Sequence, residues 1–256
     1  MRLALLGFGM ILGVQFTAPP VAVSADLATI QRRGYLTVAV KDNLQPLGFR
    51  DEAGNLVGLE IDIARQLAQA LLGSPDAVVL LPVSNPDRLA AVLEDRVDIA
   101  IAGISMTPAR MRLVSFSVPY YLDGTALISR DANLRELRDV RRAEIAVLDN
   151  SDTIATVRYL LPGTALVGVK SYEQALEALE SGEADAFAGD VTILTGWVQE
   201  YPEYHLLPDL LSAEPLAVVI PKGTQYDDLR NSINRTVNEW HQSGWLEERS
   251  TYWGLP

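Results

Sequence analysis

One pattern of apolar and polar positions, a helix followed by a turn and a strand, occurs twice along the chain. Residues 89–103 combine an amphipathic helical pattern, a charged turn and a run of small apolar residues that ends in glycine. Residues 175–189 repeat this order, offset by one residue. Because the repeated unit joins a helix to a strand, the pattern predicts two similar α/β lobes.

Strands and helices are predicted to alternate in both lobes. The first lobe should have strands at 36–40 and 77–83 around a helix at 58–72, and the second should have strands at 144–148 and 166–169 around a helix at 152–161. This alternation is typical of parallel sheets with helices on both faces. The predicted boundaries are a first lobe of residues 26–121 and 216–256, a second lobe of residues 122–215, crossings at 124–129 and 216–220, and a helix at 226–243 that returns to the first lobe.

The first 25 residues have the pattern of a cleavable signal peptide. Arg2 precedes an apolar stretch at 3–16, and the small residues at 22–25 suit a signal peptidase that cuts before Asp26. The apolar stretch is short and interrupted for a membrane span, so an uncleaved anchor is the lesser alternative. These features predict export to the periplasm.

Charge and cysteine content narrow the range of partners. The 256-residue chain carries 21 Lys and Arg against 33 Asp and Glu, a formal net charge of −12 at pH 7, and it has no cysteine. Such an acidic protein repels nucleic acid and anionic membrane surfaces. Without cysteine it has no disulfide, thiolate metal site or lipidated cysteine. We therefore expect a monomer without a lipid anchor, which binds a small molecule and a protein partner and uses no metal or cofactor.

A positively charged side chain stands where a helix favours a negative one. The apolar run 99–102 predicts a buried strand, and Thr107 and Pro108 predict the N-cap and first residue of a helix, which puts Arg110 in its first turn. A cation there opposes the helix dipole, so the arrangement favours a bound anion that meets the guanidinium and the backbone amides together. The simplest such anion is a small carboxylate. In isolation, Arg110 would be interpreted as a solvated residue beside Arg112.

The residues around Arg110 form a longer run that favours the binding role. The run comprises Asp98, Gly103, Ser105, Thr107, Arg110, Val114, Phe116, Ser117, Pro119, Tyr120 and Tyr121. It resembles the signature of the family 3 extracellular solute-binding proteins, the polar amino-acid receptors of bacterial ABC importers. The resemblance implies the two-lobed periplasmic-binding-protein fold of type II, in which each lobe is a mainly parallel sheet flanked by helices and the ligand cleft lies between the lobes. It also implies an amino-acid ligand, capture by lobe closure, and delivery to the membrane permease of an ABC transporter.

The resemblance assigns site residues to both lobes. On the first lobe, Arg110 is expected to bind the ligand carboxylate with Ser105, beside Gly103 and Thr107. On the second lobe, Asp190 matches the acidic residue that accepts hydrogen bonds from the ligand α-ammonium. A guanidinium and a carboxylate on opposite lobes would draw the lobes together around a zwitterion. The alternatives are structural, with Gly103 as a tight strand exit and Asp190 as an ordinary N-cap.

The expected side-chain pocket departs from the family pattern. Leu44 stands where an aromatic residue often stacks on the ligand, and Asn85 where an aromatic residue or leucine is common. Lys41 occupies a position that is often acidic in receptors for cationic ligands, although a shift of one residue would put Asp42 there. Lys41 and Asn85 favour a polar or acidic ligand side chain.

Two further candidates stand at the head of the predicted second-lobe helix. Ser151 and Asp152 occupy the place where the family often has a Gly-Thr turn. Both are candidate ligand contacts, although as helix caps they need no function. A contact from Asp152 would argue against an acidic ligand.

Three functions are compatible with this pattern. The first, which we expect, is an importer's binding protein without enzymatic activity. The second is an enzyme on the same scaffold, similar to the periplasmic cyclohexadienyl dehydratases, which would need an acid or base facing the cleft. Glu60 and Asp62 are predicted to be surface or capping residues, and His205 and His241 lack acidic or ligand-spaced partners. The third is a sensor for a separate membrane partner.

Overall fold

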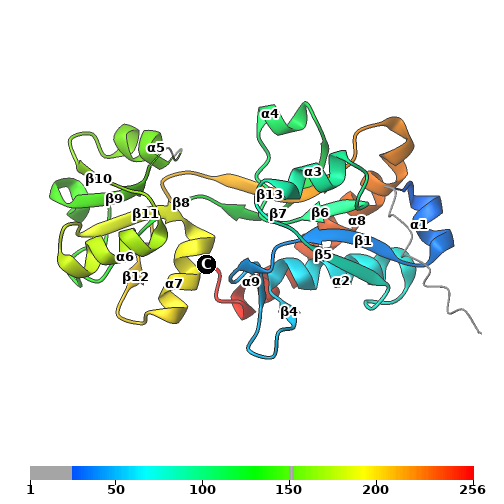
Figure 1. Ribbon diagram of the computed structural model, residues 1–256, viewed down its shortest axis with the longest axis horizontal. Coiled ribbons are helices and arrows are strands. Elements are labelled where there is room, and N and C mark those ends of the chain that lie inside the picture. Colours follow the sequence, from blue (N-terminus) through cyan, green and yellow to red (C-terminus); the bar gives the residue numbers. More distant parts are fainter. Residues whose placement is uncertain (1–24, 150, 152) are drawn as a thin grey trace, which may run out of the picture.

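Two five-stranded sheets lie toward opposite ends of an elongated molecule (Figure 1). This computed structural model describes residues 25–149, 151 and 153–256, so residues 1–24 of the predicted signal peptide and the candidate Asp152 lie outside the described residues. The first sheet has the order β5-β1-β6-β13-β7, with β1 (Leu36–Val40), β5 (Val78–Pro82), β6 (Ile99–Ile101), β7 (Ser115–Asp123) and β13 (Glu214–Ile220). The second has the order β10-β9-β11-β8-β12, with β8 (Thr125–Ser129), β9 (Glu144–Leu148), β10 (Ala165–Val169), β11 (Ala186–Asp190) and β12 (His205–Leu206). A small sheet contains β2 (Asn43–Leu44), β3 (Gly48–Arg50) and β4 (Leu56–Val57).

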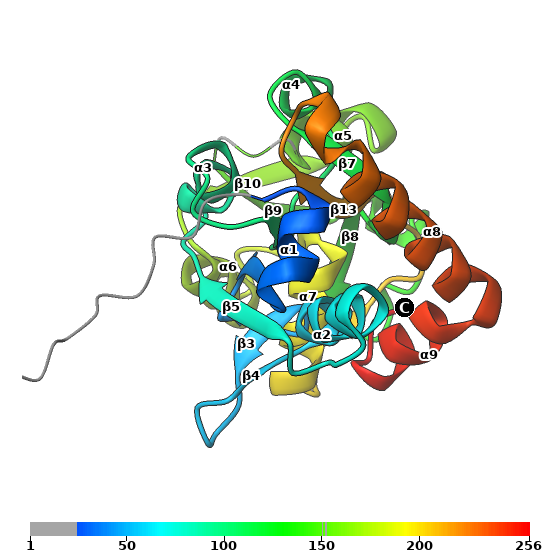
Figure 2. The same ribbon diagram turned by 90° about the vertical axis from the view of Figure 1, so that its right-hand side faces the viewer.

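Helices cover both faces of each large sheet. The first lobe contains α1 (Leu27–Arg33), α2 (Leu59–Leu72), α3 (Asp87–Leu93), α4 (Pro108–Met111), η2 (Thr224–Tyr226), α8 (Asp227–Ser243) and α9 (Trp245–Tyr252), and the second contains η1 (Asp139–Arg142), α5 (Thr153–Leu160), α6 (Tyr172–Ser181) and α7 (Val191–Glu200). Figure 2 shows α2, α8 and α9 together on one side of the first lobe, with α3 away from them. Alternate residues of β1 divide between the two faces, since Val38 packs in the core beneath α2 and α8, and Ala39 packs with α3.

The strand directions agree with the predicted α/β class, but each large sheet is half parallel and half antiparallel rather than mainly parallel. β1 pairs in parallel with β5 and β6, and β9 pairs in parallel with β10 and β11. The remaining strands, β13 and β7 in the first sheet and β8 and β12 in the second, add antiparallel pairs. β1 and β9 have the predicted bounds, and α2 follows Gly58 as its N-cap residue.

The lobe crossings lie elsewhere than predicted. Residues 125–129 form β8 inside the second sheet, and residues 216–220 belong to β13 inside the first sheet. Both segments are completely buried, which suits pairing within a sheet better than an exposed crossing. The chain instead passes between the sheets around Gly124, where β7 ends, and between β12 and β13. The two crossings touch, because a Cβ atom on Gly124 would lie 2.0 Å from the Ser212 carbonyl oxygen.

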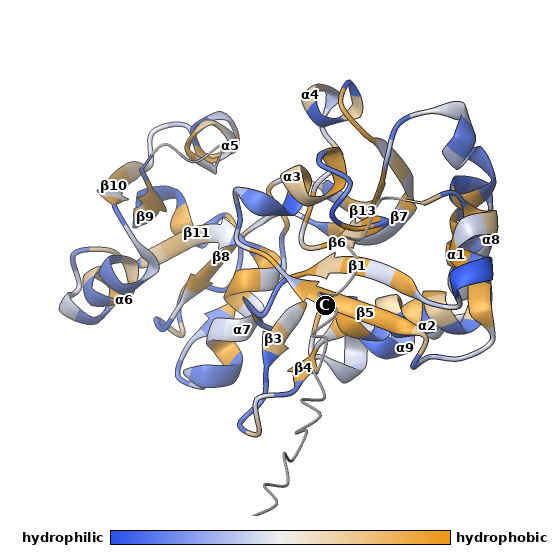
Figure 3. Ribbon diagram, turned by 45° about the vertical axis from the view of Figure 1, so that its right-hand side comes forward, coloured by the Kyte–Doolittle hydropathy of each residue, from blue (hydrophilic) through white to orange (hydrophobic). Residues whose placement is uncertain are grey.

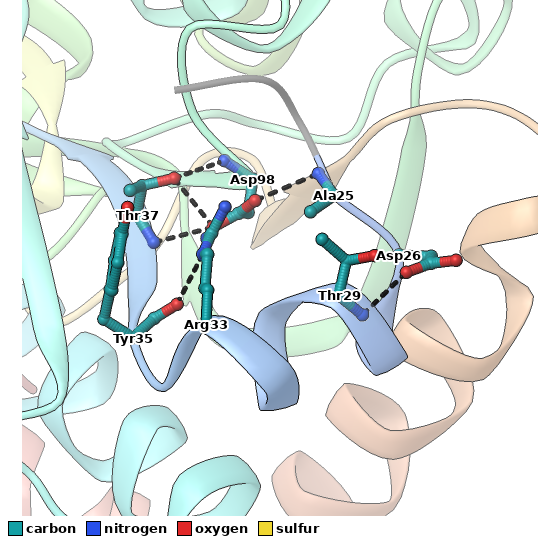
Figure 4. Close-up of polar contacts among 7 residues, drawn as sticks. All are labelled: Ala25, Asp26, Thr29, Arg33, Tyr35, Thr37 and Asp98. Atoms are coloured by element: carbon teal, nitrogen blue, oxygen red, sulfur yellow. Dashed lines mark hydrogen bonds and ion pairs between the residues drawn. The ribbon is translucent and has the colours of Figure 1, made fainter. Parts of the chain in front are cut away.

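A buried carboxylate joins the N-terminal segment to the first sheet (Figure 4). Asp98, just before β6, is 0% exposed. It accepts hydrogen bonds from the backbone N–H of Ala25 at 3.1 Å and from the N–H and hydroxyl of Thr37, each at 2.7 Å, and it pairs with Arg33. One side chain therefore fixes α1, β1 and β6 relative to one another.

Hydrophobic residues concentrate in the sheets. β1 and β5 are largely hydrophobic in Figure 3, whereas the turn between β3 and β4 is hydrophilic. Within the described ranges, no helix has the length and apolar character needed to cross a bilayer.

Candidate functional site

A cavity of about 290 Å³ is lined by residues of both lobes. Its lining includes first-lobe residues near the end of β6 and the starts of β13 and α3, and second-lobe residues near the starts of α5, α6 and α7. They are Leu44, Leu47, Asn85, Arg88, Gly103, Ser105, Arg110, Asp123, Ser151, Thr153, Tyr172, Asp190, Thr192, Ile193, Glu214 and Leu216. The position agrees with the rule that ligands bind beyond the carboxyl ends of strands in open α/β sheets.

The Arg110 guanidinium is held at the first-lobe side of the cavity. The Thr107 side chain accepts a hydrogen bond from the Arg110 N–H at 3.3 Å and so caps α4, which begins at Pro108 as predicted. Arg110 Nη1 donates to the Ser105 carbonyl oxygen at 2.9 Å. The fixed guanidinium retains further N–H donors, which suit a carboxylate acceptor.

Asp190 lies on the second-lobe side of the same cavity. It ends β11 and occupies the N-cap position of α7, but its exposed side chain makes no capping hydrogen bond. That role belongs to Asp123, whose carboxylate accepts hydrogen bonds from the Thr192 hydroxyl at 2.8 Å and the Thr192 N–H at 3.3 Å. Asp123 also accepts the Gly124 N–H at 2.9 Å. Burial raises the pKa of Asp123, and these hydrogen bonds oppose the rise.

Glu60 is neither a surface residue nor a cap, contrary to the prediction. It is 0% exposed, and its Oε1 atom accepts hydrogen bonds from the Gly103 N–H at 2.7 Å and from the Tyr120 hydroxyl. Its Oε2 atom has no hydrogen-bond partner among the residues that the structure describes. Burial raises the pKa of Glu60 to about 6. Gly103 lines the cavity and Glu60 does not, so the Glu60 carboxylate is separated from the cavity by Gly103.

Arg88 is a cavity residue that the sequence interpretation missed. It belongs to α3, and its Nη1 atom donates to the carbonyl oxygens of Gly103 at 2.6 Å and Ala102 at 3.1 Å. Burial lowers the pKa of Arg88, and the positive charge of Arg110 lowers it further. One feature of the sequence could have indicated Arg88 as a cavity residue. It stands three residues after the candidate Asn85, at the start of the helix that follows β5.

Most other predicted site residues also line the cavity, but two do not. Leu44, Asn85, Gly103, Ser105 and Ser151 belong to the lining, together with Arg110 and Asp190. Lys41 and Thr107 are not among the lining residues. Lys41 is buried, and its ammonium donates to the Val83 carbonyl oxygen at 3.1 Å, because burial of a charged group requires a polar partner. The Thr107 side chain instead caps α4 by accepting a hydrogen bond from the Arg110 N–H.

The predicted non-site histidines lie away from this lining. His205 in β12 contacts the Leu134 carbonyl oxygen at 2.8 Å, and His241 in α8 contacts that of Pro119 at 2.8 Å. Asp62 is half-buried and accepts hydrogen bonds from Arg249 at 2.6 Å and the Trp253 indole at 2.8 Å. A search of the described residues gives no group of three or more acidic or histidine side chains arranged to hold a metal ion.

Comparisons with known proteins agree with this architecture. The glutamine-binding protein of Geobacillus stearothermophilus is 29% identical over 202 residues, which cover 78% of this chain and 77% of that protein. The cyclohexadienyl dehydratase of Pseudomonas aeruginosa is 25% identical over 249 residues, covering 91% of this chain and 87% of the enzyme. A solved structure of an ancestral cationic amino acid solute-binding protein superposes with a TM-score of 0.74 at 25% identity, covering 89% of this chain and 98% of that one. A profile of the bacterial extracellular solute-binding proteins, family 3, matches residues 36–256, and the chain belongs to this family.

Proposed function

We propose that this protein is a periplasmic receptor that captures a polar amino acid between its lobes and presents it to the permease of an ABC importer. The observation that carries the proposal is the presence of Arg110 and Asp190 in one cavity, on opposite lobes. An α-amino acid has a carboxylate and an ammonium on one carbon. Its carboxylate would meet Arg110 and Ser105, and its ammonium would meet Asp190.

Lobe closure follows from this division of contacts. Neither lobe alone carries both charged partners, so the zwitterion is fully bound only when the lobes approach each other. Closure excludes water from both ion pairs and strengthens them, because the effective dielectric constant falls. The closed receptor then differs in shape from the empty one, and a permease can recognise that difference. Relatives named as binding proteins for amino acids support the ligand class.

An enzyme is the second candidate, because one relative is a dehydratase with high coverage of both chains. Its mechanism would need an acid or base at the cavity surface. Asp123 accepts three hydrogen bonds from Gly124 and Thr192, so its carboxylate already has a structural role. Glu60 has a pKa suited to proton transfer but is absent from the cavity lining. Neither of these two buried carboxylates offers a free acid or base at the cavity surface, which favours binding without turnover.

Calorimetric titration with the common amino acids tests the proposal, with Arg110→Ala as the decisive variant. Wild-type protein should bind at least one polar amino acid, which should be recovered chemically unchanged. Loss of the guanidinium should weaken this binding by about 100-fold or more, since a buried charged partner contributes roughly 3 kcal/mol. Arg112→Ala is the matched control, because it removes the same charge from the neighbouring exposed position outside the cavity lining.

Two results would contradict the proposal. One is near-wild-type affinity in Arg110→Ala. The other is conversion of the ligand into a product by wild-type protein, which would favour the enzyme.

A further inference from the structure

A buried carboxylate with an unsatisfied oxygen lies behind Gly103, which forms part of the first-lobe wall of the cavity. The Glu60 side chain is 0% exposed, and its Oε1 atom accepts hydrogen bonds from the Gly103 N–H at 2.7 Å and from the Tyr120 hydroxyl. Nothing in the described part of the chain forms a hydrogen bond with the Oε2 atom. Buried charged groups are normally paired and hydrogen-bonded throughout, so this oxygen needs an explanation beyond packing.

Charged and titratable groups face Glu60 from α3, from β7 and from the end of β1. Arg88 of α3 favours the ionised form of Glu60, whereas Asp123 at the end of β7 disfavours it. Tyr120, also in β7, favours the ionised form through its hydrogen bond. Lys41 follows β1 and is buried, and the negative charge of Glu60 favours its charged form. The Glu60 charge therefore belongs to an electrostatic cluster that includes the cavity residues Arg88 and Asp123.

This cluster extends to the residue that we expect to hold the ligand carboxylate. Arg88 shares the cavity with Arg110, and both the positive charge of Arg110 and the negative charge of Glu60 act on it. An anion bound by Arg110 would stand on the cavity side of Gly103, with the Glu60 carboxylate on the other side. Salt and water screen buried charges much less than exposed ones, so the two anions would repel each other.

We propose that Glu60 couples amino-acid capture to pH, because the receptor binds its ligand more tightly when this side chain is protonated. The inference rests on the proposed function, in which Arg110 and Ser105 hold the ligand carboxylate. Protonation of Glu60 removes a repulsion and leaves the guanidinium of Arg110 in place. By linkage, binding of the amino acid favours uptake of a proton by Glu60.

The change of charge falls at a pH where an ordinary glutamate is already ionised. Burial raises the pKa of Glu60 to about 6, and the hydrogen bonds from Tyr120 and Gly103 oppose the rise. Burial also raises the pKa of the cavity residue Asp123, against hydrogen bonds from Gly124 and Thr192. A variant without the Glu60 charge is therefore needed to separate the two titrations.

Calorimetric titration of wild-type protein and Glu60→Gln tests the inference. The common L-amino acids are the probes at about pH 7, and the tightest binder is then measured from about pH 5 to about pH 8. Wild-type protein should bind it about three- to tenfold more tightly at the lower pH, as expected for one unit charge at an effective dielectric constant of about 20. Glu60→Gln keeps an acceptor oxygen for Gly103 and Tyr120. Its affinity should stay near the low-pH value of wild-type protein throughout.

Asp62→Asn is the matched control in the same helix. Asp62 stands two residues after Glu60 in α2, but it accepts hydrogen bonds from Arg249 and Trp253 and is absent from the cavity lining. The variant removes one negative charge from α2 and leaves the contacts of Glu60 unchanged. Its affinity should therefore vary with pH as that of wild-type protein does.

Proton uptake provides a second measurement, which decides the matter if Glu60→Gln does not fold. Titrations near pH 6.5 in buffers of different ionisation enthalpy give the number of protons taken up on binding. Wild-type protein should take up roughly 0.3–0.5 protons per amino acid bound, which corresponds to the expected change in affinity. Tyr120→Phe removes a hydrogen bond that lowers the pKa of Glu60, so its uptake should reach a maximum at higher pH.

The outcomes separate this inference from the proposed function. Binding that is independent of pH, without proton uptake, would overturn the coupling and leave the receptor function standing. An affinity that falls on acidification would also overturn it, by showing that ionised Glu60 supports the wall through Gly103. A wild-type pH profile that persists in Glu60→Gln would assign the proton to another group. No binding of any common amino acid by wild-type protein would overturn both proposals.

Discussion

Two carboxylates stand at opposite ends of the short strand β6, and both are 0% exposed. Asp98 precedes the strand, and both of its oxygens accept hydrogen bonds, with Arg33 as a cationic partner. Glu60 contacts Gly103, just beyond the other end, through one oxygen, and the second oxygen has no hydrogen-bond partner within the described part of the chain.

The difference reflects what each end of the strand does. At the end away from the cavity, a complete set of partners fixes the fold, and a buried ion pair of this kind is costly to break. At the cavity end, the carboxylate keeps an unsatisfied oxygen and a raised pKa, so its charge responds to pH. A carboxylate that is equally buried can therefore be a rigid joint or a responsive group, according to its partners.

The largest expected effect on stability comes from Asp98, the carboxylate with a complete set of partners. Asp98→Asn should lower the free energy of unfolding by about 3 kcal/mol, because Arg33 loses its charge partner and the amide nitrogen cannot accept the hydrogen bonds that the carboxylate accepts. Urea denaturation measures the change, while the ligand affinity of the folded protein should be unchanged. Asp76→Asn removes a carboxylate that is 85% exposed and should show no comparable loss. A loss below about 1 kcal/mol in Asp98→Asn would remove the contrast between the two carboxylates.

The second effect is a pH dependence at Glu60. The folded protein holds the Glu60 proton with a pKa of about 6, against 4.5 for an ordinary glutamate, so the folded state binds this proton more tightly than the unfolded chain does. Wild-type protein should therefore lose stability relative to Glu60→Gln as the pH rises from about 4.5 to about 6, by on the order of 2 kcal/mol. Below this window both states hold the proton, and above it the loss is complete.

Urea denaturation of both proteins across this window measures the difference. A wild-type protein that gains stability relative to Glu60→Gln as the pH rises would reverse the sign and contradict the assignment.

The smallest expected effect comes from removing the Tyr120 hydroxyl, which donates a hydrogen bond to Glu60. Tyr120→Phe removes the hydroxyl that donates to Oε1 and leaves the Gly103 N–H in place. Stability should fall by about 1 kcal/mol. Because the Tyr120 hydrogen bond lowers the pKa of Glu60 in the folded protein, its loss should raise the upper end of the pH window and leave the lower end, set by the unfolded chain, unchanged. The same denaturation series reads the shift, and a window that stays in place would show that the hydroxyl does not stabilise the charged carboxylate.

Local patterns were sufficient to predict the elements that depend on local chemistry. The cap of α4 at Thr107, the bounds of β1 and β9, and the meeting of Arg110 with Asp190 at one cavity follow from caps, apolar runs and the internal repeat. The positions of the crossings between the lobes were predicted wrongly. An apolar strand and an apolar connecting segment have the same sequence pattern, and only the strand partners distinguish them.

The missed residues share a dependence on distant partners. Glu60 has the local signature of an exposed residue in the first turn of a helix, and it is buried because Gly103 and Tyr120 arrive from other strands. Asp123 caps a helix that begins 68 residues later in the chain, so no local pattern links the two. Arg88 lines the cavity beside Arg110 because the fold brings α3 and α4 together, and no local pattern in the sequence shows this.

The cap that Asp123 provides also has a kinematic consequence. Asp123 is the last residue of β7 in the first sheet, and its carboxylate holds Thr192 in the first turn of α7 in the second lobe. This contact lies beside the crossing at Gly124, so a rotation of the lobes that preserves it has its axis close by. In a rigid rotation, displacement is proportional to the distance from the axis. On closure, Asp190, two residues before Thr192, would therefore cover only a short distance toward Arg110, while the outer parts of the second lobe would sweep the widest arc.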